Sequence, residues 1–131
     1  MEFFCVYCKN RKKFDKYVKS SSIKRKYIID IKRIIEDEEI VDYHSDMTYV
    51  KILILNKINQ AIEKKMDIYY LPLFDDSYEF EKLMNLRQVI GRENNFNIII
   101  FWNEFQNDKH ILTEAIGELP RFNTSQILKD F

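Results

Sequence analysis

Glycine and proline are scarce in this sequence, with only two of each among 131 residues. Sandwiches and barrels of many short strands need turn-forming residues about every 8–12 positions. The scarcity of turn formers therefore argues against these all-β folds. It favours long helices that are joined to a few buried strands.

Cysteine and long apolar runs are also rare. Two cysteines are too few for a disulfide framework, and Met1–Phe4 lacks the basic residues that begin a secretory signal peptide. The longest nearly apolar run, Phe96–Trp102, is far shorter than the about 20 residues that span a bilayer. We therefore expect a cytoplasmic protein with no membrane segment.

Apolar and charged side chains are plentiful, at 46% and 32% of the chain. This apolar content can fill one core, which argues against a disordered protein. The length is typical of a single domain, and no repeat or linker divides it, so we expect one domain over residues 1–131. The abundance of Ile, Lys, Asn, Phe and Tyr is typical of AT-rich coding sequences, such as those of many phages and some low-GC bacteria, and of these we favour a viral protein.

The net charge of zero hides an asymmetry along the chain. Residues 1–33 contain eleven basic and three acidic residues, a net charge of +8, and the rest of the chain has a net charge of −8. Such a dipolar chain can present a basic face to a partner.

Strand and helix patterns alternate along the chain. Strands are predicted over Glu2–Cys8, near 26–31, over Ile68–Leu73 with Pro72 at its exit, and over Phe96–Trp102. Four helices are predicted. The first follows Asn10, which can cap it, and the second covers about 46–65. The third begins at 75–77 and runs to Ile90, where Gly91 can end it, and the fourth runs from 107 or 108 to Leu119. Because Ile52, Leu53 and Leu55 widen the apolar stripe of helix 46–65, we expect that helix to lie between layers. The last eleven residues are predicted to form a short helix or a tail.

Residues 23–35 fit two structures. Their apolar residues have helical spacing, yet Tyr27–Ile31 is also typical of a buried strand. We favour a strand near 26–31 followed by a short helix. The alternation then predicts a three-layer α/β/α domain with a mostly parallel sheet of about four strands.

A C-x-x-C motif, Cys5–Cys8, leads into the first predicted helix and is similar to the motif of thioredoxins and glutaredoxins. Only four residues precede it, however, and no later segment resembles their cis-proline loop. His44 and His110 lack the spacing of zinc ligands. We therefore interpret both cysteines as small apolar residues of a buried strand, and we expect no metal or cofactor.

Asp30-Ile31-Lys32 resembles half of the metal-binding strand of restriction-type nucleases. In that family an acid holds Mg²⁺ and a lysine steadies the charge, so the resemblance implies catalytic roles for Asp30 and Lys32. The other half of the motif needs a preceding acid at a strand end. Asp15, the one acid at a suitable distance, lies in a predicted helix.

A basic segment with interleaved aromatic residues predicts a nucleic-acid site. Its lysines can bind phosphates, and Phe14, Tyr17 and Tyr27 are available for base stacking unless they point into the core. The predicted binding residues are Lys9, Arg11, Lys12, Lys13, Lys16, Lys19, Lys24, Arg25 and Lys26.

Polar residues also follow the predicted strands, where ligands of open α/β sheets bind. They are Lys9, Asn10, Asp75, Asp76, Asn103 and Glu104. Caps and turns use the same residue types. Arg87 and Arg92, near a helix end, are interpreted as surface or capping residues.

Residues 27–105 resemble P-loop nucleoside and polynucleotide kinases in the order of their segments. The strand YIID is followed by a long helix, the strand DIYYLP, a helix with Arg87 and the strand FNIIIFW. That family binds phosphate with a G-x-x-x-x-G-K-[ST] loop after the first strand. Here this position reads CKNRKKFDKY, without glycine, so the resemblance implies a degenerate member that does not transfer phosphate.

Three functions are compatible with these observations. The first is a small, non-enzymatic accessory or regulatory protein that acts through contacts with a protein partner or with its own copies. The second is a nucleic-acid-binding protein that uses residues 9–26. The third is an Mg²⁺-dependent nuclease that uses Asp30 and Lys32.

Overall fold

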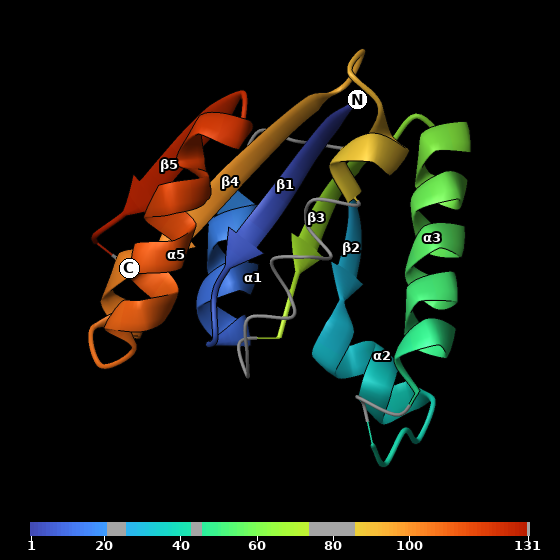
Figure 1. Cartoon of the computed structure of the whole chain (residues 1–131), viewed down its shortest axis with the longest axis horizontal. Coiled ribbons are helices and arrows are strands. Elements are labelled where there is room, and N and C mark those ends of the chain that lie inside the picture. The colour runs from blue at the N-terminus through green and yellow to red at the C-terminus, as the bar shows by residue number, and fades with distance from the viewer. Residues whose placement is uncertain (21–25, 43–45, 74–85, 131) are drawn as a thin grey trace.

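The fold is known from a computed structural model, which describes residues 1–20, 26–42, 46–73 and 86–130. Five parallel strands form one sheet in the order β2-β3-β1-β4-β5 (Figure 1). The strands are β1 (Glu2–Tyr7), β2 (Lys26–Asp30), β3 (Asp67–Leu71), β4 (Asn95–Phe101) and β5 (Thr124–Leu128). The predicted α/β class and parallel sheet are confirmed.

The helices follow the predicted order. They are α1 (Arg11–Ser20), α2 (Ile31–Asp37), α3 (Met47–Glu63) and α5 (Lys109–Glu118), with short 3-10 helices over Trp102–Phe105 and Leu119–Arg121. The strand favoured near 26–31 and the helix after it are confirmed as β2 and α2. Residues 86–90 are helical, whereas the predicted start of that helix lies outside the described residues.

Helices cover both faces of the sheet, and two apolar clusters fill the space between them (Figure 1). On one face, Phe14 and Val18 of α1 pack on strand residues such as Tyr69 and Phe101. The larger cluster, on the other face, joins the sheet to α2, α3, residues 86–90 and α5. Among the described helices, α1 is therefore the single cover of its face.

The prediction of a short helix or tail at the C-terminus is wrong. Thr124–Leu128 forms a fifth strand, which pairs with β4. The sequence gives no strand pattern here. An edge strand has one neighbour, and four of the five residues of β5 are exposed, so hydrogen bonds to β4 and not an apolar run define it.

The expected burial of α3 between layers is wrong. Val50, Ile54, Ile58 and Ala61 face the sheet and are buried, whereas Ile52 is 51% exposed. The additional apolar residues of this helix therefore reach its outer side. No helix among the described residues combines the length and apolar character needed to cross a membrane.

Candidate functional site

The candidate site lies at the carboxyl ends of the strands, where β1 passes into α1 through Cys8, Lys9 and Asn10. Asn10 caps α1 as predicted, because its side-chain oxygen accepts hydrogen bonds from the backbone N–H groups of Lys12 (3.0 Å) and Lys13 (3.4 Å). The connection thus has three residues and contains no glycine. It is the segment that the P-loop resemblance would assign to phosphate binding.

Glu104 binds this connection from the neighbouring strand end. Its carboxylate accepts hydrogen bonds from the backbone N–H groups of Lys9 (2.7 Å) and Asn10 (2.9 Å). The Lys9 ammonium pairs with Asp108, just before α5, and lies 5.1 Å from the centre of the Phe105 ring. The hydrogen bond from Lys9 lowers the pKa of Asp108. The loop after β1 is thus tied to the segment after β4.

Several residues predicted at this edge are therefore brought together: Lys9, Asn10 and Glu104 are in direct contact. Asn103 lies next to Glu104 and donates to the backbone oxygen of Lys129, after β5. Asp75 and Asp76 lie outside the described residues. The sequence marked Glu104 only as a polar residue after a strand, and no motif signalled its bonds to residues about ninety positions earlier.

Arg11 and Asp30 form a bidentate ion pair beside this loop. The distances are 2.7 Å from Nε to Oδ2 and 2.8 Å from Nη2 to Oδ1, and the Asp30 side chain is only 14% exposed. Arg11 also donates to the backbone oxygen of Cys8, and Asp30 accepts from the backbone N–H of Lys32 (3.2 Å) as the N-cap of α2. Both charges are thus used to join α1, β2 and α2.

These contacts do not support the nuclease hypothesis. The Asp30 carboxylate is bound to a guanidinium, and Lys32 is exposed on α2. In the part of the chain that the structure describes, no three Asp, Glu, His or Cys side chains are close enough to hold a metal ion. A hollow of about 550 Å³ beside Asp30 is lined by both acidic and basic side chains.

The two cysteines lie on opposite faces of the sheet. Cys5 belongs to the larger cluster and Cys8 to the α1 cluster, and neither forms a disulfide. The Cys8 thiol donates to the backbone oxygen of Asn10 (3.2 Å). Burial, followed by the charge of Glu104, raises the pKa of Cys8 to about 12. The two thiols therefore belong to different clusters, and Cys8 is not an acidic thiol of the kind that redox motifs use.

The predicted nucleic-acid residues fall into three groups. Lys9 and Arg11 are in ion pairs at the strand ends. Lys12, Lys16 and Lys19 are exposed on the outer side of α1, with Lys13 half-buried beside them. Lys24 and Arg25 lie outside the described residues, and Lys26 begins β2. Sequence neighbours are thus divided between a structural and an exposed set.

The aromatic residues of the basic segment pack against the protein. Phe14 is 2% exposed and meets the Tyr69 ring edge-on at 5.7 Å. Tyr17 packs edge-on against Phe101 at 5.8 Å, and its hydroxyl donates to Gln126 at 2.7 Å. These side chains hold α1 on the sheet and are not positioned for base stacking.

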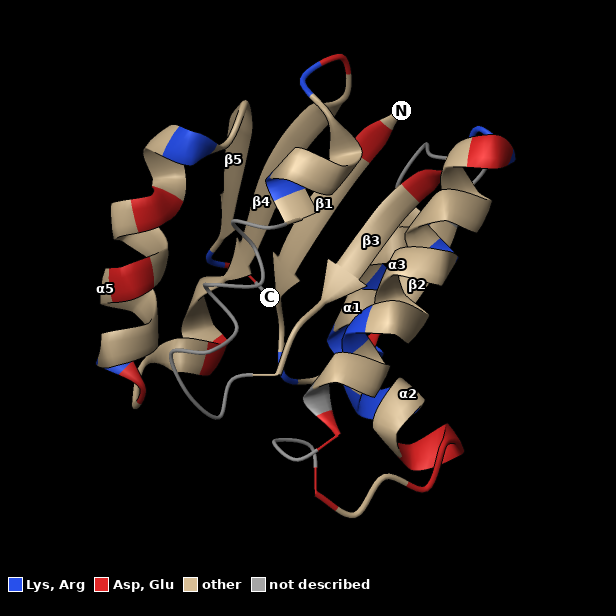
Figure 2. Cartoon of the chain, turned by 45° about the vertical axis from the view of Figure 1, so that its right-hand side comes forward, with Lys and Arg blue, Asp and Glu red and all other residues tan. Residues whose placement is uncertain are grey.

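The charge asymmetry of the sequence becomes an asymmetry between layers. The basic segment forms α1, while acidic residues 36–39 lie at the end of α2, in the opposite layer (Figure 2). Asp15 is the one acid of α1. The α1 layer is therefore the basic side of the described molecule.

Neither a protein-family model, nor a curated protein, nor a solved structure matches this chain.

Proposed function

We propose that this protein binds the phosphate backbone of a nucleic acid through the exposed lysines of α1. The observation that carries the proposal is the row of Lys12, Lys16 and Lys19, which lie about one helical turn apart on the outer side of the helix. None of them forms an ion pair with any residue in the described part of the chain. The row is about 10 Å long, which is long enough to contact several successive phosphates.

The proposed contacts are electrostatic and independent of base sequence. Lysine ammonium groups neutralise phosphates and release their counterions, whereas sequence is recognised through base edges or by stacking. Because Phe14 and Tyr17 pack on the sheet, α1 offers charges without exposed rings. The expected binding is therefore salt-sensitive and similar for different sequences.

The contacts at the strand ends support binding without catalysis. A P-loop enzyme needs free backbone N–H groups after its first strand to hold phosphate. The N–H groups of Lys9 and Asn10 are instead bonded to Glu104. The kinase-like ancestry remains a prediction, and so do the phage origin and the cytoplasmic location.

The test is a fluorescence anisotropy titration of labelled single- and double-stranded oligonucleotides over a series of salt concentrations, with EDTA present. For duplex DNA, contacts from three lysines predict a slope of log K against log salt of about −3, from about −0.9 per phosphate. Changing Lys12, Lys16 and Lys19 together to Gln should flatten the slope and weaken binding at low salt by more than about tenfold.

The matched control is the triple change of Lys51, Lys64 and Lys109 to Gln. These lysines are exposed on α3, just after it and on α5, in the opposite layer, and the net charge changes equally. The control should bind as the wild type does. An equal loss in both triple variants would refute a site on α1.

Protein binding is the second candidate function, and exposed apolar side chains on the outer side of α3 favour it. Tyr49 and Ile52, one turn apart, are 47% and 51% exposed. The occupant that we propose is a second copy of the chain, since a net charge of zero lowers the repulsion between copies.

Sedimentation equilibrium tests this candidate. Association through an apolar face should persist in high salt, be abolished by Ile52→Glu and survive Ile116→Glu, which changes an exposed residue of α5. A wild-type protein that stays monomeric at every concentration would exclude association through α3.

A further inference from the structure

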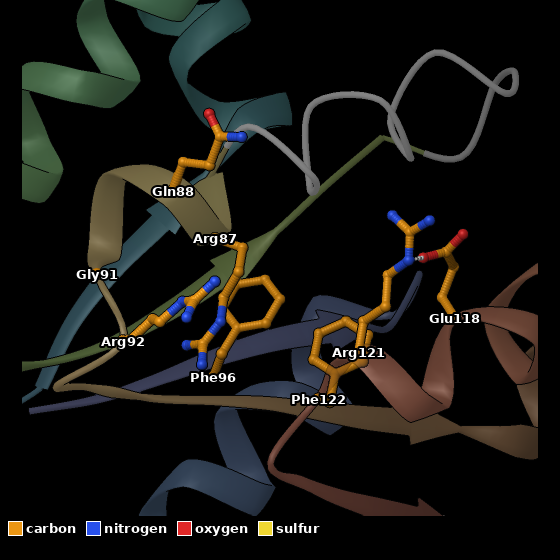
Figure 3. A pocket seen from close by; sticks show the side chains of 8 residues that line it. All are labelled: Arg87, Gln88, Gly91, Arg92, Phe96, Glu118, Arg121 and Phe122. Atoms are coloured by element: carbon orange, nitrogen blue, oxygen red, sulfur yellow. Dashed lines mark ion pairs between the residues drawn. The ribbon is translucent and has the colours of Figure 1, made fainter.

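A pocket of about 670 Å³ lies at the opposite edge of the sheet, near the amino ends of β4 and β5 (Figure 3). Its lining comes from three places: residues 87–92 before β4, the start of β4 itself, and residues 118–122 between α5 and β5. The volume is within the range of about 300–1,000 Å³ that small-ligand pockets occupy. It is separate from the contacts around Glu104.

Arginine is concentrated in this pocket. Among the described residues that line it are Arg87, Arg92 and Arg121, three of the six arginines of the chain, and no lysine. Guanidinium groups bind phosphates and carboxylates through two parallel N–H bonds and stack on flat rings, neither of which an ammonium does. The pocket therefore has the donors of a planar anion site.

The three guanidinium groups differ in how they are held. Arg87 donates to the backbone oxygen of Asn94 (3.1 Å) and lies 5.4 Å from the centre of the Phe96 ring. Arg121 pairs with Glu118 at 3.0 Å. Arg92 is exposed and has no ion-pair partner in the described chain. Two arginines are thus oriented by neighbours, and the third is available to a ligand.

Charge and position both favour an anion between the arginines. Arg87 and Arg92 extend from one wall and Arg121 from the other (Figure 3). Among the described residues of the lining, Glu118 is the one acid, so these walls have excess positive charge. The carboxylate of Glu93 lies over Gly91, which is itself part of the lining.

Phe96 and Phe122 form the flat part of the pocket. Their rings are nearly parallel, at an interplanar angle of 2° and a centroid distance of 4.7 Å. Phe96 is buried, whereas Phe122 is half-buried and keeps part of its ring accessible. A planar group that enters beside Arg121 can pack on Phe122 and extend the stack.

We propose that this pocket binds a small phosphomonoester that carries a planar ring, which is the chemistry of a mononucleotide. Its phosphate lies between the Arg92 and Arg121 guanidinium groups, and its ring packs on Phe122. This site does not depend on the proposed function of α1, because the two use different residues at different places on the fold.

The test is calorimetric titration of the full chain with AMP, adenosine and inorganic phosphate. We expect AMP to bind at least about tenfold more tightly than adenosine, because adenosine lacks the charged partner of the arginines. Inorganic phosphate should also bind more weakly than AMP, because it lacks the ring.

Variants then locate the site. Arg92→Gln and Arg121→Gln should each weaken AMP binding by about tenfold or more. Arg33→Gln, an exposed arginine of α2, and the triple lysine variant of α1 should bind AMP as the wild type does. Arg92 has no intramolecular ion pair, so Arg92→Gln should keep the thermal unfolding midpoint. The proposal is overturned if AMP does not bind, if adenosine binds equally well, or if Arg92→Gln leaves AMP affinity unchanged.

Discussion

At the residue scale, Glu104 occupies the position that a ligand's anion takes in many parallel α/β proteins. Backbone N–H groups that follow a strand and precede a helix attract negative charge. Here that charge comes from the protein, through hydrogen bonds of 2.7 and 2.9 Å. The carboxylate therefore stabilises the turn from β1 into α1 and occupies both of these N–H groups.

Replacing this carboxylate should cost stability. Glu104→Ala removes the acceptor of two exposed backbone N–H groups, which water then hydrates, and we expect the free energy of unfolding to fall by about 1 kcal/mol. Urea denaturation measures the change. Glu114→Ala, on the exposed side of α5, is the control and should stay within about 0.5 kcal/mol of the wild type. If the two variants are equally stable, Glu104 does not support the loop.

Cys8 predicts a loss of stability in alkali. The pKa of the Cys8 thiol is about 12 in the folded protein and 9.0 for an ordinary thiol, so the unfolded chain loses the thiol proton at a lower pH than the folded protein does. The contribution of Cys8 to the free energy of unfolding is therefore complete below pH 9 and decreases as the pH rises from 9 to about 12. Denaturation at pH 8 and pH 10.5 should show a smaller decrease for Cys8→Ala than for the wild type. Equal decreases would mean that Cys8 does not titrate in this way.

At the element scale, the ring of Phe14 is one of the buried contacts that hold α1 on the sheet. This ring is 2% exposed and packs against Tyr69. Phe14→Ala should lower the free energy of unfolding by about 3–5 kcal/mol, since it leaves a cavity under the one described helix of that face. Lys16→Ala, on the outer side of α1, should change it by less than about 0.5 kcal/mol. Chemical denaturation that finds similar values for both would show that α1 is loosely attached.

Elements with an apolar pattern could be predicted, and the one without it could not. Phe96–Trp102 is apolar except for Asn97 because β4 is buried on both faces, and Asn10 marked the start of α1 through its capping oxygen. Thr124–Leu128 has no such run because β5 is an exposed edge strand. The apolar stripe of α3 is wider than the buried face of this helix, because Ile52 faces outward, so the width of the stripe wrongly predicted burial between layers.

The sites were harder to predict because their residues are distant in sequence. Lys9 and Glu104 were both expected at the carboxyl edge, yet their bond depends on β1 and β4 being neighbours. Arg92 and Arg121 line one pocket only after β5 joins β4. Local patterns contain no information about such pairings, so the sequence predicted Arg92 only as a surface or capping residue and predicted no role for Arg121.

At the scale of the whole molecule, the zero net charge is divided between two layers. The sequence pI of 6.7 predicts a slightly negative protein at pH 7.5. Even so, the α1 layer should bind a sulfonate cation exchanger at low salt, because attraction depends on local charge. The triple change of Lys12, Lys16 and Lys19 to Gln should lower the salt concentration needed for elution. The triple change of Lys51, Lys64 and Lys109 to Gln should leave the salt concentration of elution nearly unchanged. An equal decrease for both triple variants would show that the positive charge is not concentrated on the α1 layer.

The central position of β1 has a consequence for synthesis of the chain. β1 leaves the ribosome before β3 and β4, with which it pairs, and its hydrogen bonds join residues 65 and 93 positions apart. Until β4 has emerged, one edge of β1 has no partner. Contacts between such distant residues slow folding and leave apolar strands exposed during the delay. A nascent chain that ends before β4 therefore exposes an apolar strand edge to which a chaperone can bind.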